Sequence, residues 1–246
     1  MVDHLYRTFY GVQDQAMETT QFHTFEGTFV KTKVHKFEFE DGPFNKITVD
    51  RIPGYGITNL KVSGEFESLE ILIGNVKFEK FWNLPGFTCY LQNHIEPCLE
   101  HMLMEFKVHH TGPVEVSYDY VKLLNYDKET NYQVLFQQTQ LQEVDLNKGL
   151  NKIPVYFNHP VTKLKLVQKN RETTLKDPFL VFPEAETMVY FTEANEKIFE
   201  PSVNFSRVEK CFLYVESTED CRIYVIAECK QIMRYMYGMA GVAFSK

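Results

Sequence analysis

Short stretches in which apolar and polar residues alternate recur along most of the chain. Residues 114–124 place Val114, Val116, Tyr118 and Tyr120 on one face, with polar residues between them up to residue 119. A period of two is typical of a β-strand with one buried face. Comparable stretches occur at residues 28–40, 47–52, 69–73, 102–108, 153–157, 164–166, 211–216 and 222–227. The pattern therefore predicts a succession of short strands.

Turn-forming residues separate these predicted strands. Asp41-Gly42-Pro43 and Gly112-Pro113 each end one of them, as the backbone preferences of Gly and Pro lead us to expect. Helical periodicity is scarce, and the best candidate for a short helix spans residues 127–137. Many short strands with turns between them indicate an all-β sandwich or barrel.

The strand pattern falls into two similar halves, and the polar, Gln-rich stretch at residues 126–150 is the expected join. We therefore expect an N-terminal arm at residues 1–15, a first β domain at residues 16–127 and a second at residues 128–246. The length of 246 residues allows one large β domain or two small ones. A single larger sandwich is the alternative.

Composition narrows the classes of function. Aromatic residues make up 15% of the chain, which favours strands, and the net charge is −7. A phosphate backbone is bound by clustered Lys and Arg, so nucleic acid is not expected as a direct partner. The chain has no run of 18 apolar residues, so we expect no transmembrane helix. We also expect no signal peptide. The five Cys are odd in number and form no CxxC pair, which favours free thiols.

Candidate chemistry is sparse. No Gly-rich phosphate loop, GxSxG or HExxH motif occurs, so we expect no enzyme, no metal and no cofactor. We interpret His159 as a turn residue before Pro160. The other histidines singled out match no metal-binding spacing: His94, His101, His109 and His110. A series of basic residues could bind an anion, although a solvated strand face fits it better: Lys163, Lys165, Lys169 and Arg171.

The end of the chain, QIMRYMYGMAGVAFSK (residues 231–246), is rich in Met and Tyr and has no acidic residue. Terminal segments are usually polar and frayed. We therefore expect residues 235–244 to be ordered and buried, in the second domain or under a neighbouring subunit. Gly238 and Gly241 would permit positive φ or a close backbone approach. Arg234 should be hydrogen-bonded at the boundary of this segment.

This ending resembles that of the major capsid proteins of large eukaryotic (nucleocytoplasmic) DNA viruses. The matching positions are Arg234, Met236, Gly238, Met239, Gly241, Ala243 and Ser245. Three more segments resemble the same family in the same order: YGVQDQAMETTQFHTF (residues 10–25), DYVKLL (119–124) with FNHPVTKLKLV (157–167), and NFSRVEKCFL (204–213). Together the segments span nearly the whole chain.

The resemblance implies an all-β chain with two compact jelly-roll sandwiches in tandem, or alternatively one larger jelly roll. Family members are usually nearly twice as long, so the missing length would be large surface loops. The implied function is a self-assembling viral structural protein that forms trimeric capsomers. It would be assembled in the host cell and located in the virion, with other virion proteins as partners and possible contact with an internal membrane.

The same resemblance suggests which side chains lie at subunit boundaries: Arg207, Arg234, Met236, Met239 and Phe244. Flexible Met side chains and aromatic rings are suited to such interfaces. Two alternatives stay open. One is a minor capsid protein of the same lineage, and the other is a jelly-roll module that binds a carbohydrate or another ligand as a monomer.

Overall fold

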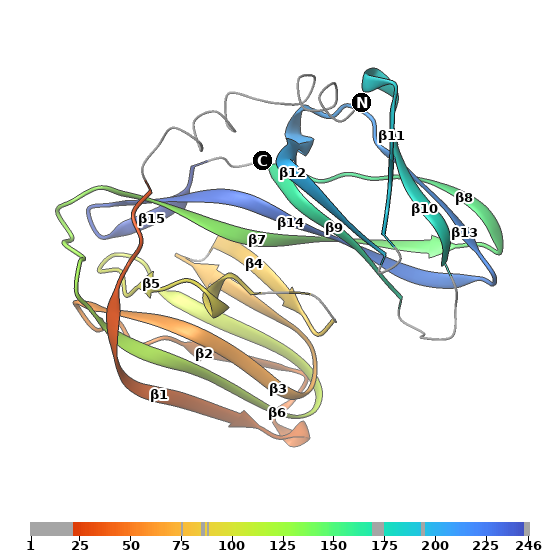
Figure 1. Ribbon diagram of the computed structural model, residues 1–246. Coiled ribbons are helices and arrows are strands. Elements are labelled where there is room, and N and C mark those ends of the chain that lie inside the picture. Colours follow the sequence, from red (N-terminus) through yellow and green to blue (C-terminus); the bar gives the residue numbers. More distant parts are fainter. Residues whose placement is uncertain are drawn as a thin grey trace. The chain divides into compact units, whose positions relative to one another are not determined.

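The computed structural model describes residues 22–74, 76–84, 87, 89–168, 175–192 and 195–243. The arm expected at residues 1–15 and the candidate Phe244 lie outside these residues. The described residues form antiparallel strands and short 3-10 helices, with no α-helix among them (Figure 1). The expected all-β fold is thereby confirmed.

The bounds of the elements follow the chain order. The strands are β1 Gly27–Phe37, β2 Phe44–Thr48, β3 Tyr55–Ile73, β4 Val76–Trp82, β5 Glu96–Pro97, β6 Met104–Leu123, β7 Tyr132–Leu146, β8 Gly149–Pro154, β9 Pro160–Gln168, β10 Leu175–Phe182, β11 Thr187–Tyr190, β12 Glu196–Asn204, β13 Phe212–Ser217, β14 Cys221–Met236 and β15 Met239–Val242. The 3-10 helices are η1 Phe39–Asp41, η2 Tyr90–Gln92, η3 Pro183–Ala185 and η4 Phe205–Arg207.

The chain divides into two compact units. The described residues 22–138 and 232–243 belong to the first unit, and residues 139–231 belong to the second. The observed division thus falls at residue 138/139, whereas the sequence pattern placed it at 127/128. The C-terminal segment belongs to the first unit and not to the second, because its strands complete the packing of the first core.

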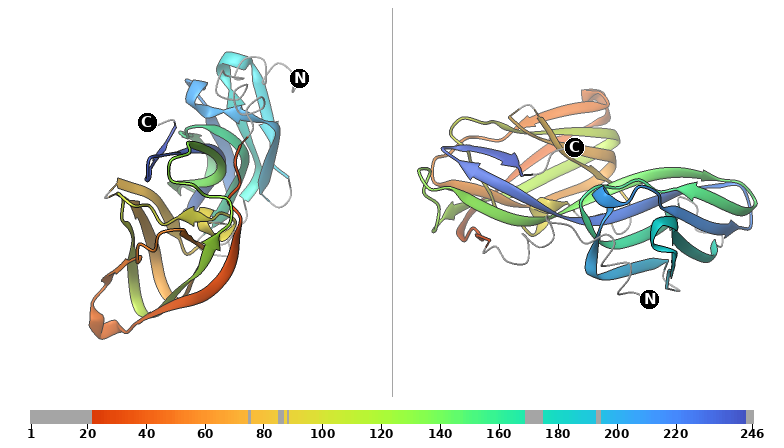
Figure 2. Two further views of the ribbon diagram at one scale, coloured as in Figure 1. Left: turned by 90° about the vertical axis from the view of Figure 1, so that its left-hand side faces the viewer. Right: turned by 90° about the horizontal axis from the view of Figure 1, so that it is seen from above.

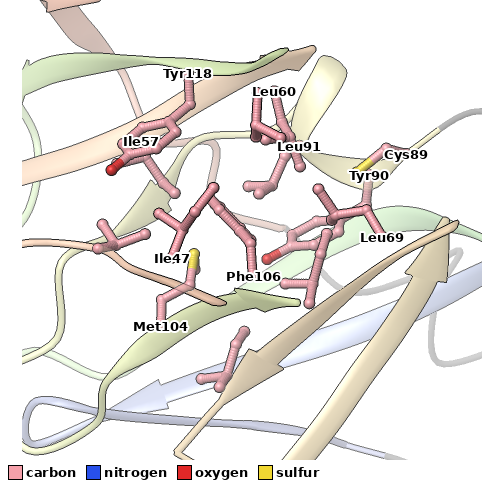
Figure 3. Close-up of a cluster of buried hydrophobic side chains, with 14 of the residues drawn as sticks. Ile47, Ile57, Leu60, Leu69, Cys89, Tyr90, Leu91, Met104, Phe106 and Tyr118 are labelled. Atoms are coloured by element: carbon pink, nitrogen blue, oxygen red, sulfur yellow. The ribbon is translucent and has the colours of Figure 1, made fainter. Parts of the chain in front are cut away.

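The first unit contains a sheet with the strand order β1-β6-β3-β4, to which β2 and β5 add short pairings. Its core combines aromatic and aliphatic side chains from this sheet and from η2 (Figure 3). Phe106, Leu69 and Leu91 are fully buried there, and Tyr118 is 1% exposed. Such burial stabilises by about 1.5–3 kcal/mol for each large apolar side chain.

Gly112-Pro113 does not end a strand, contrary to expectation, since β6 continues through it from Met104 to Leu123. On one side, β6 pairs with β2 before this dipeptide and with β1 after it. Pro113 lies at the point where the strand beside β6 changes from β2 to β1. The amide hydrogen that proline lacks is therefore not needed to pair with either strand. On the other side Gly64 has φ of +102°, and a Cβ there would lie 2.2 Å from the carbonyl oxygen of Pro113. Only glycine fits that approach.

The second unit has two sheets. One has the order β11-β10-β13-β8, and the other contains β12, β9 and the first part of β14. Alternating side chains from both sheets fill the core, including Leu164, Leu180, Leu213 and Val225, all fully buried. The strands expected at residues 164–166, 211–216 and 222–227 lie in β9, β13 and β14.

The expected helix at residues 127–137 is wrong. Asp127 accepts hydrogen bonds from the amide of Glu129 and the hydroxyl of Thr130, which makes a tight turn. From Tyr132 the chain is strand β7, which runs beside β14 in Figures 1 and 2. The Gln-rich join is therefore part of a strand and not a linker.

The glutamines of β7 act as substitutes for backbone groups. Gln140 donates to the carbonyl of Asn158 and accepts from its amide. Gln142 does the same with the carbonyl of Pro154 and the amide of Tyr156. These side chains satisfy the backbone of an irregular segment that has no strand partner at those groups. The polar composition that suggested a linker thus serves hydrogen bonding within the second unit.

Candidate interface surfaces

The C-terminal hairpin gathers three of the five candidate interface residues on one face. In the register of β14 and β15, Met236 is opposite Met239 and Arg234 is opposite Gly241. Since side chains alternate along a strand, Arg234, Met236 and Met239 share one side, which we call the hairpin outer face. Met236 is 47% exposed and Met239 is 49% exposed. Solvent-facing methionines of this kind are suited to contact with a partner.

The opposite side of the hairpin is buried. Met233 and Tyr235 are each 1% exposed and pack in the core of the first unit. The hydroxyl of Tyr235 donates to Oε2 of Glu96 at 2.7 Å and lies 3.2 Å from Nε2 of His94. Burial, followed by the Glu96 carboxyl, raises the pKa of Tyr235 well above its ordinary value. The expectation that the whole segment is buried therefore holds for alternate residues only.

The hairpin turn explains one of the two glycines. Tyr237 and Gly238 both have positive φ, 50° and 70°, as a two-residue hairpin turn requires. Gly238 is buried, and a Cβ there would lie 3.2 Å from Cβ of Glu100. Gly241 needs neither positive φ nor close packing, since a Cβ there would meet nothing within 4 Å.

The two arginines among the candidate interface residues, Arg207 and Arg234, lie at the surface. Arg234 is exposed, and its guanidinium forms no hydrogen bond or ion pair with the part of the chain that the structure describes. The expected fixed guanidinium is therefore not seen within the chain. Arg207 is exposed at the end of η4 in the second unit. Arg207 has an interaction partner within the chain. Both arginines stay candidates for contacts with another molecule on sequence grounds.

Two of the family-like segments, FNHP and NFSR, meet in one compact junction of the second unit. Asn204 is opposite Pro160 in the pairing of β12 with β9. The amide of His159 donates to Oγ of Ser206 at 2.8 Å, and the amide of Phe205 donates to the carbonyl of His159 at 3.0 Å. The side chain of Asn204 accepts from the amide of Ser206 and caps η4. The junction thus fixes the loop that carries Arg207.

His159 belongs to this structure rather than to a reactive site. It is buried with φ of 67°, and its Nε2 lies 2.9 Å from Nε2 of Gln231. Asn204-Phe205-Ser206 has the form of a glycosylation sequon. Asn204 is only 2% exposed, so its side chain is fixed in the junction and is not an open glycosylation site.

The other residues considered for chemistry are dispersed. His109 contacts Glu67 at 2.8 Å, whereas His110 is buried against Asn45 and the carbonyl of Gly112. Within the described ranges, no group of three or more His, Cys, Asp or Glu side chains could hold a metal. Lys163 and Lys165 each form a 3.1 Å ion pair with Glu196, so their charge is compensated. Lys169 and Arg171 lie outside the described residues.

All five cysteines are free thiols. Cys89, Cys211 and Cys229 are buried, and burial raises their pKa. For the partly buried Cys98, burial raises the pKa to about 11. A thiol with a raised pKa is a poor nucleophile.

A cavity of about 140 Å³ lies beside Cys89 and Tyr90. Its volume is well below the ~300 Å³ at which typical small-molecule sites begin.

One surface that the sequence analysis did not identify lies on the outer side of the sheet β11-β10-β13-β8. Two cross-strand rows of side chains point away from the core: Lys152, Tyr214, Phe179 and Tyr190 in one row, and Pro154, Phe212, Val181 and Met188 in the other. We call these eight residues the aromatic face. The continuous apolar runs at residues 179–182, 188–191 and 211–215 could have indicated strands that are apolar on both sides.

The rings of the aromatic face stack in order across the strands. The rings of Phe179 and Tyr214 are parallel within 2° at 5.2 Å, and Phe179 and Tyr190 are 5.4 Å apart. Nζ of Lys152 lies 4.3 Å from the ring centre of Phe212. Tyr190 is 60% exposed and Met188 is 45% exposed. A solvent-facing side of a sheet is usually polar, so this one is suited to being covered.

No helix among the described residues is both long and apolar enough to cross a membrane.

No protein-family model matches the chain, and no curated protein matches it by sequence. Solved structures do match. The PBCV-1 virus capsid is 12% identical, with a TM-score of 0.65 over 92% of this chain and 100% of that chain. PBCV-1 VP54, fitted into a reconstruction of the virophage Sputnik, is 12% identical, with a TM-score of 0.67 over the same shares. The chain therefore has the double jelly-roll fold of these viral capsid proteins.

Proposed function

We propose that this protein is a structural subunit of a virus particle, which self-assembles into trimeric capsomers that form a shell. The main observation behind the proposal is the similarity in fold to the PBCV-1 capsid. It covers 92% of this chain and 100% of the capsid chain. Fold alone does not imply function. The surfaces described above add support that is independent of the comparison.

Those surfaces are of the kind that assembly uses. The hairpin outer face exposes Met236 and Met239, and the aromatic face exposes Tyr190 and Met188. Aromatic residues, Met and Arg are enriched in the buried centres of interfaces between subunits. Arg207, Arg234, Met236 and Met239 remain our proposed interface residues. Phe244 remains one on sequence grounds alone.

A structural role also agrees with the lack of a reactive constellation in the described chain. Burial raises the pKa of Cys89, Cys98, Cys211 and Cys229, the described histidines are dispersed, and the cavity beside Tyr90 is small. We propose that the protein acts by packing and not by catalysis, with itself and other virion proteins as partners. Its location would be the virion.

Light scattering on the purified chain tests this function. We expect a particle mass of three times the 29.0 kDa of one chain at micromolar concentration. The mass should be constant on dilution over a tenfold range, because subunit interfaces of standard size are stable at such concentrations. A monomer at every concentration and salt condition would contradict self-assembly and favour a monomeric ligand-binding module.

A further inference from the structure

The aromatic face borders an edge at which another strand can pair. β11 is the last strand of its sheet, and within the described chain it pairs with β10 alone. The amide of Phe191 donates to the carbonyl of Pro178 at 3.0 Å, which makes Phe179 and Tyr190 a non-hydrogen-bonded pair. The backbone groups of Met188 and Tyr190 therefore point away from β10, toward the open edge. An incoming strand would extend both rows of the aromatic face by one side chain.

A second open edge lies on β1 of the first unit. β1 is the last strand of its sheet, and among described residues it pairs only with β6. The amide of Leu124 donates to the carbonyl of Glu26, so by alternation the backbone groups of Gly27 and Phe29 point outward. Phe29 is 60% exposed, and Val30 and Val34 are 45% and 46% exposed. An edge strand presents unpaired backbone groups with which another chain can pair, and these exposed apolar side chains would be covered in such a contact.

The charges of the two edges are opposite. β1 carries Lys31, Lys33 and Lys36 and no acidic residue. Lys33 and Lys36 form ion pairs within the chain, with Asp50 at 3.9 Å and Glu115 at 3.2 Å, whereas Lys31 forms none within the described ranges. β11 is preceded by Glu184 and Glu186, which are exposed and form no ion pair within the described ranges. Pairing β1 with a second β1 would place lysines opposite each other and would be destabilising. Pairing β1 with β11 places opposite charges together.

We propose that β1 of one copy of this chain docks along β11 of a second copy and covers the exposed end of the aromatic face. The inference rests on the proposed self-assembly and names the surfaces that carry it. Because the two surfaces differ, the contact is head-to-tail, and each copy offers one of each kind. Such a contact closes into a ring when the rotation between copies allows it, which agrees with a cyclic trimer.

A pair of engineered cysteines tests the contact in the full chain. In the double variant Phe29→Cys/Tyr190→Cys, cysteines on docked strands would lie within the Cα separation of about 4.4–6.8 Å that a disulfide requires. We expect oxidation to give covalent dimers and trimers on a non-reducing gel. All variants carry Cys98→Ser and Cys221→Ser, because these two native thiols are only partly buried, whereas Cys89, Cys211 and Cys229 are buried. In this background the parent chain and each single variant should stay monomeric on the same gel.

The outcomes separate this inference from the proposed function. If the wild type is a trimer in solution but the double variant gives no covalent multimer, or only a cross-link within one chain, the β1–β11 contact is wrong and self-assembly stands. Dimers formed as readily by a single variant would show like edges pairing and also overturn it. A monomeric wild type would overturn both.

Charge reversal covers the case in which the cysteine variant fails to fold. We expect Lys31→Glu/Lys33→Glu and Glu184→Lys/Glu186→Lys each to weaken self-association at least tenfold, and their combination to restore most of it. Additive weakening in the combined variant would contradict the contact.

Discussion

The hydroxyl of Tyr235 donates a 2.7 Å hydrogen bond to Oε2 of Glu96, a residue 139 positions earlier in the chain. Glu96 is fully buried in β5, and Nε2 of His94 lies 3.4 Å from the same oxygen. A buried carboxylate is costly unless it is hydrogen-bonded. Tyr235 therefore satisfies one buried oxygen of Glu96 and ties the C-terminal hairpin to the first unit.

Replacing Tyr235 by Phe should destabilise the protein by about 1–3 kcal/mol, because Glu96 loses its donor while remaining buried. Urea unfolding followed by circular dichroism measures this change. Tyr237→Phe is the matched control, since Tyr237 is 65% exposed two residues further on. Its free energy of unfolding should stay within about 0.5 kcal/mol of the wild type. Equal effects of the two variants would show that the hydrogen bond contributes nothing specific.

The two sides of the hairpin should separate assembly from stability. Met236→Ser/Met239→Ser alters exposed side chains, so we expect unchanged unfolding of the isolated chain and weaker self-association. Met233→Ala removes a side chain that is 1% exposed and should cost about 2–5 kcal/mol of stability. Unfolding and light scattering on both variants give the comparison. Full assembly of the double serine variant would remove the hairpin outer face from the interface.

The FNHP–NFSR junction gives a third prediction. Ser206→Ala removes the acceptor for the amide of His159 and should lower stability by about 1–3 kcal/mol. Thr218→Ala, at an exposed turn position, should leave thermal unfolding nearly unchanged. A Ser206→Ala protein that melts at the wild-type temperature would mean that the junction is held by its backbone pairing alone.

Alkaline pH should destabilise the protein through its buried phenols. Burial raises the pKa of Tyr90 and Tyr235 well above the value of about 10 in the unfolded chain. The contribution of each buried phenol to the free energy of unfolding is therefore fully present below pH ~10. Above that pH it falls by about 1.4 kcal/mol per pH unit for each phenol. Absorbance at 295 nm should show these phenols ionising only as circular dichroism reports unfolding. Reversible titration of all phenols near pH 10 in the folded chain would contradict their burial.

Local alternation was enough to predict many strands, because a half-buried strand records its two faces in every second residue. The stretch 114–124 and the pair Leu164 and Leu166 are examples. The prediction that Gly112-Pro113 ends a strand was wrong. A strand can continue through this dipeptide because the neighbouring strand changes there from β2 to β1, which depends on segments far away in the sequence. The helix at 127–137 failed because the turn at Asp127 and the partner β14 both favour an extended chain.

The candidate interface was only partly predictable. The sequence identified Arg234, Met236 and Met239, but not that alternation exposes them while burying Met233 and Tyr235. It could not place the tail in the first unit, since that depends on a hydrogen bond to Glu96 from far along the chain. The aromatic face depends on the register of four strands, and no single segment displays that register.

Electron cryomicroscopy of the purified protein tests the central claim, self-assembly into capsomers, most directly. We predict class averages with threefold symmetry, in which each of three subunits contributes two jelly-roll lobes and the outline is nearly hexagonal. Single two-lobed particles of 29.0 kDa at every concentration, without symmetric oligomers, would contradict the account.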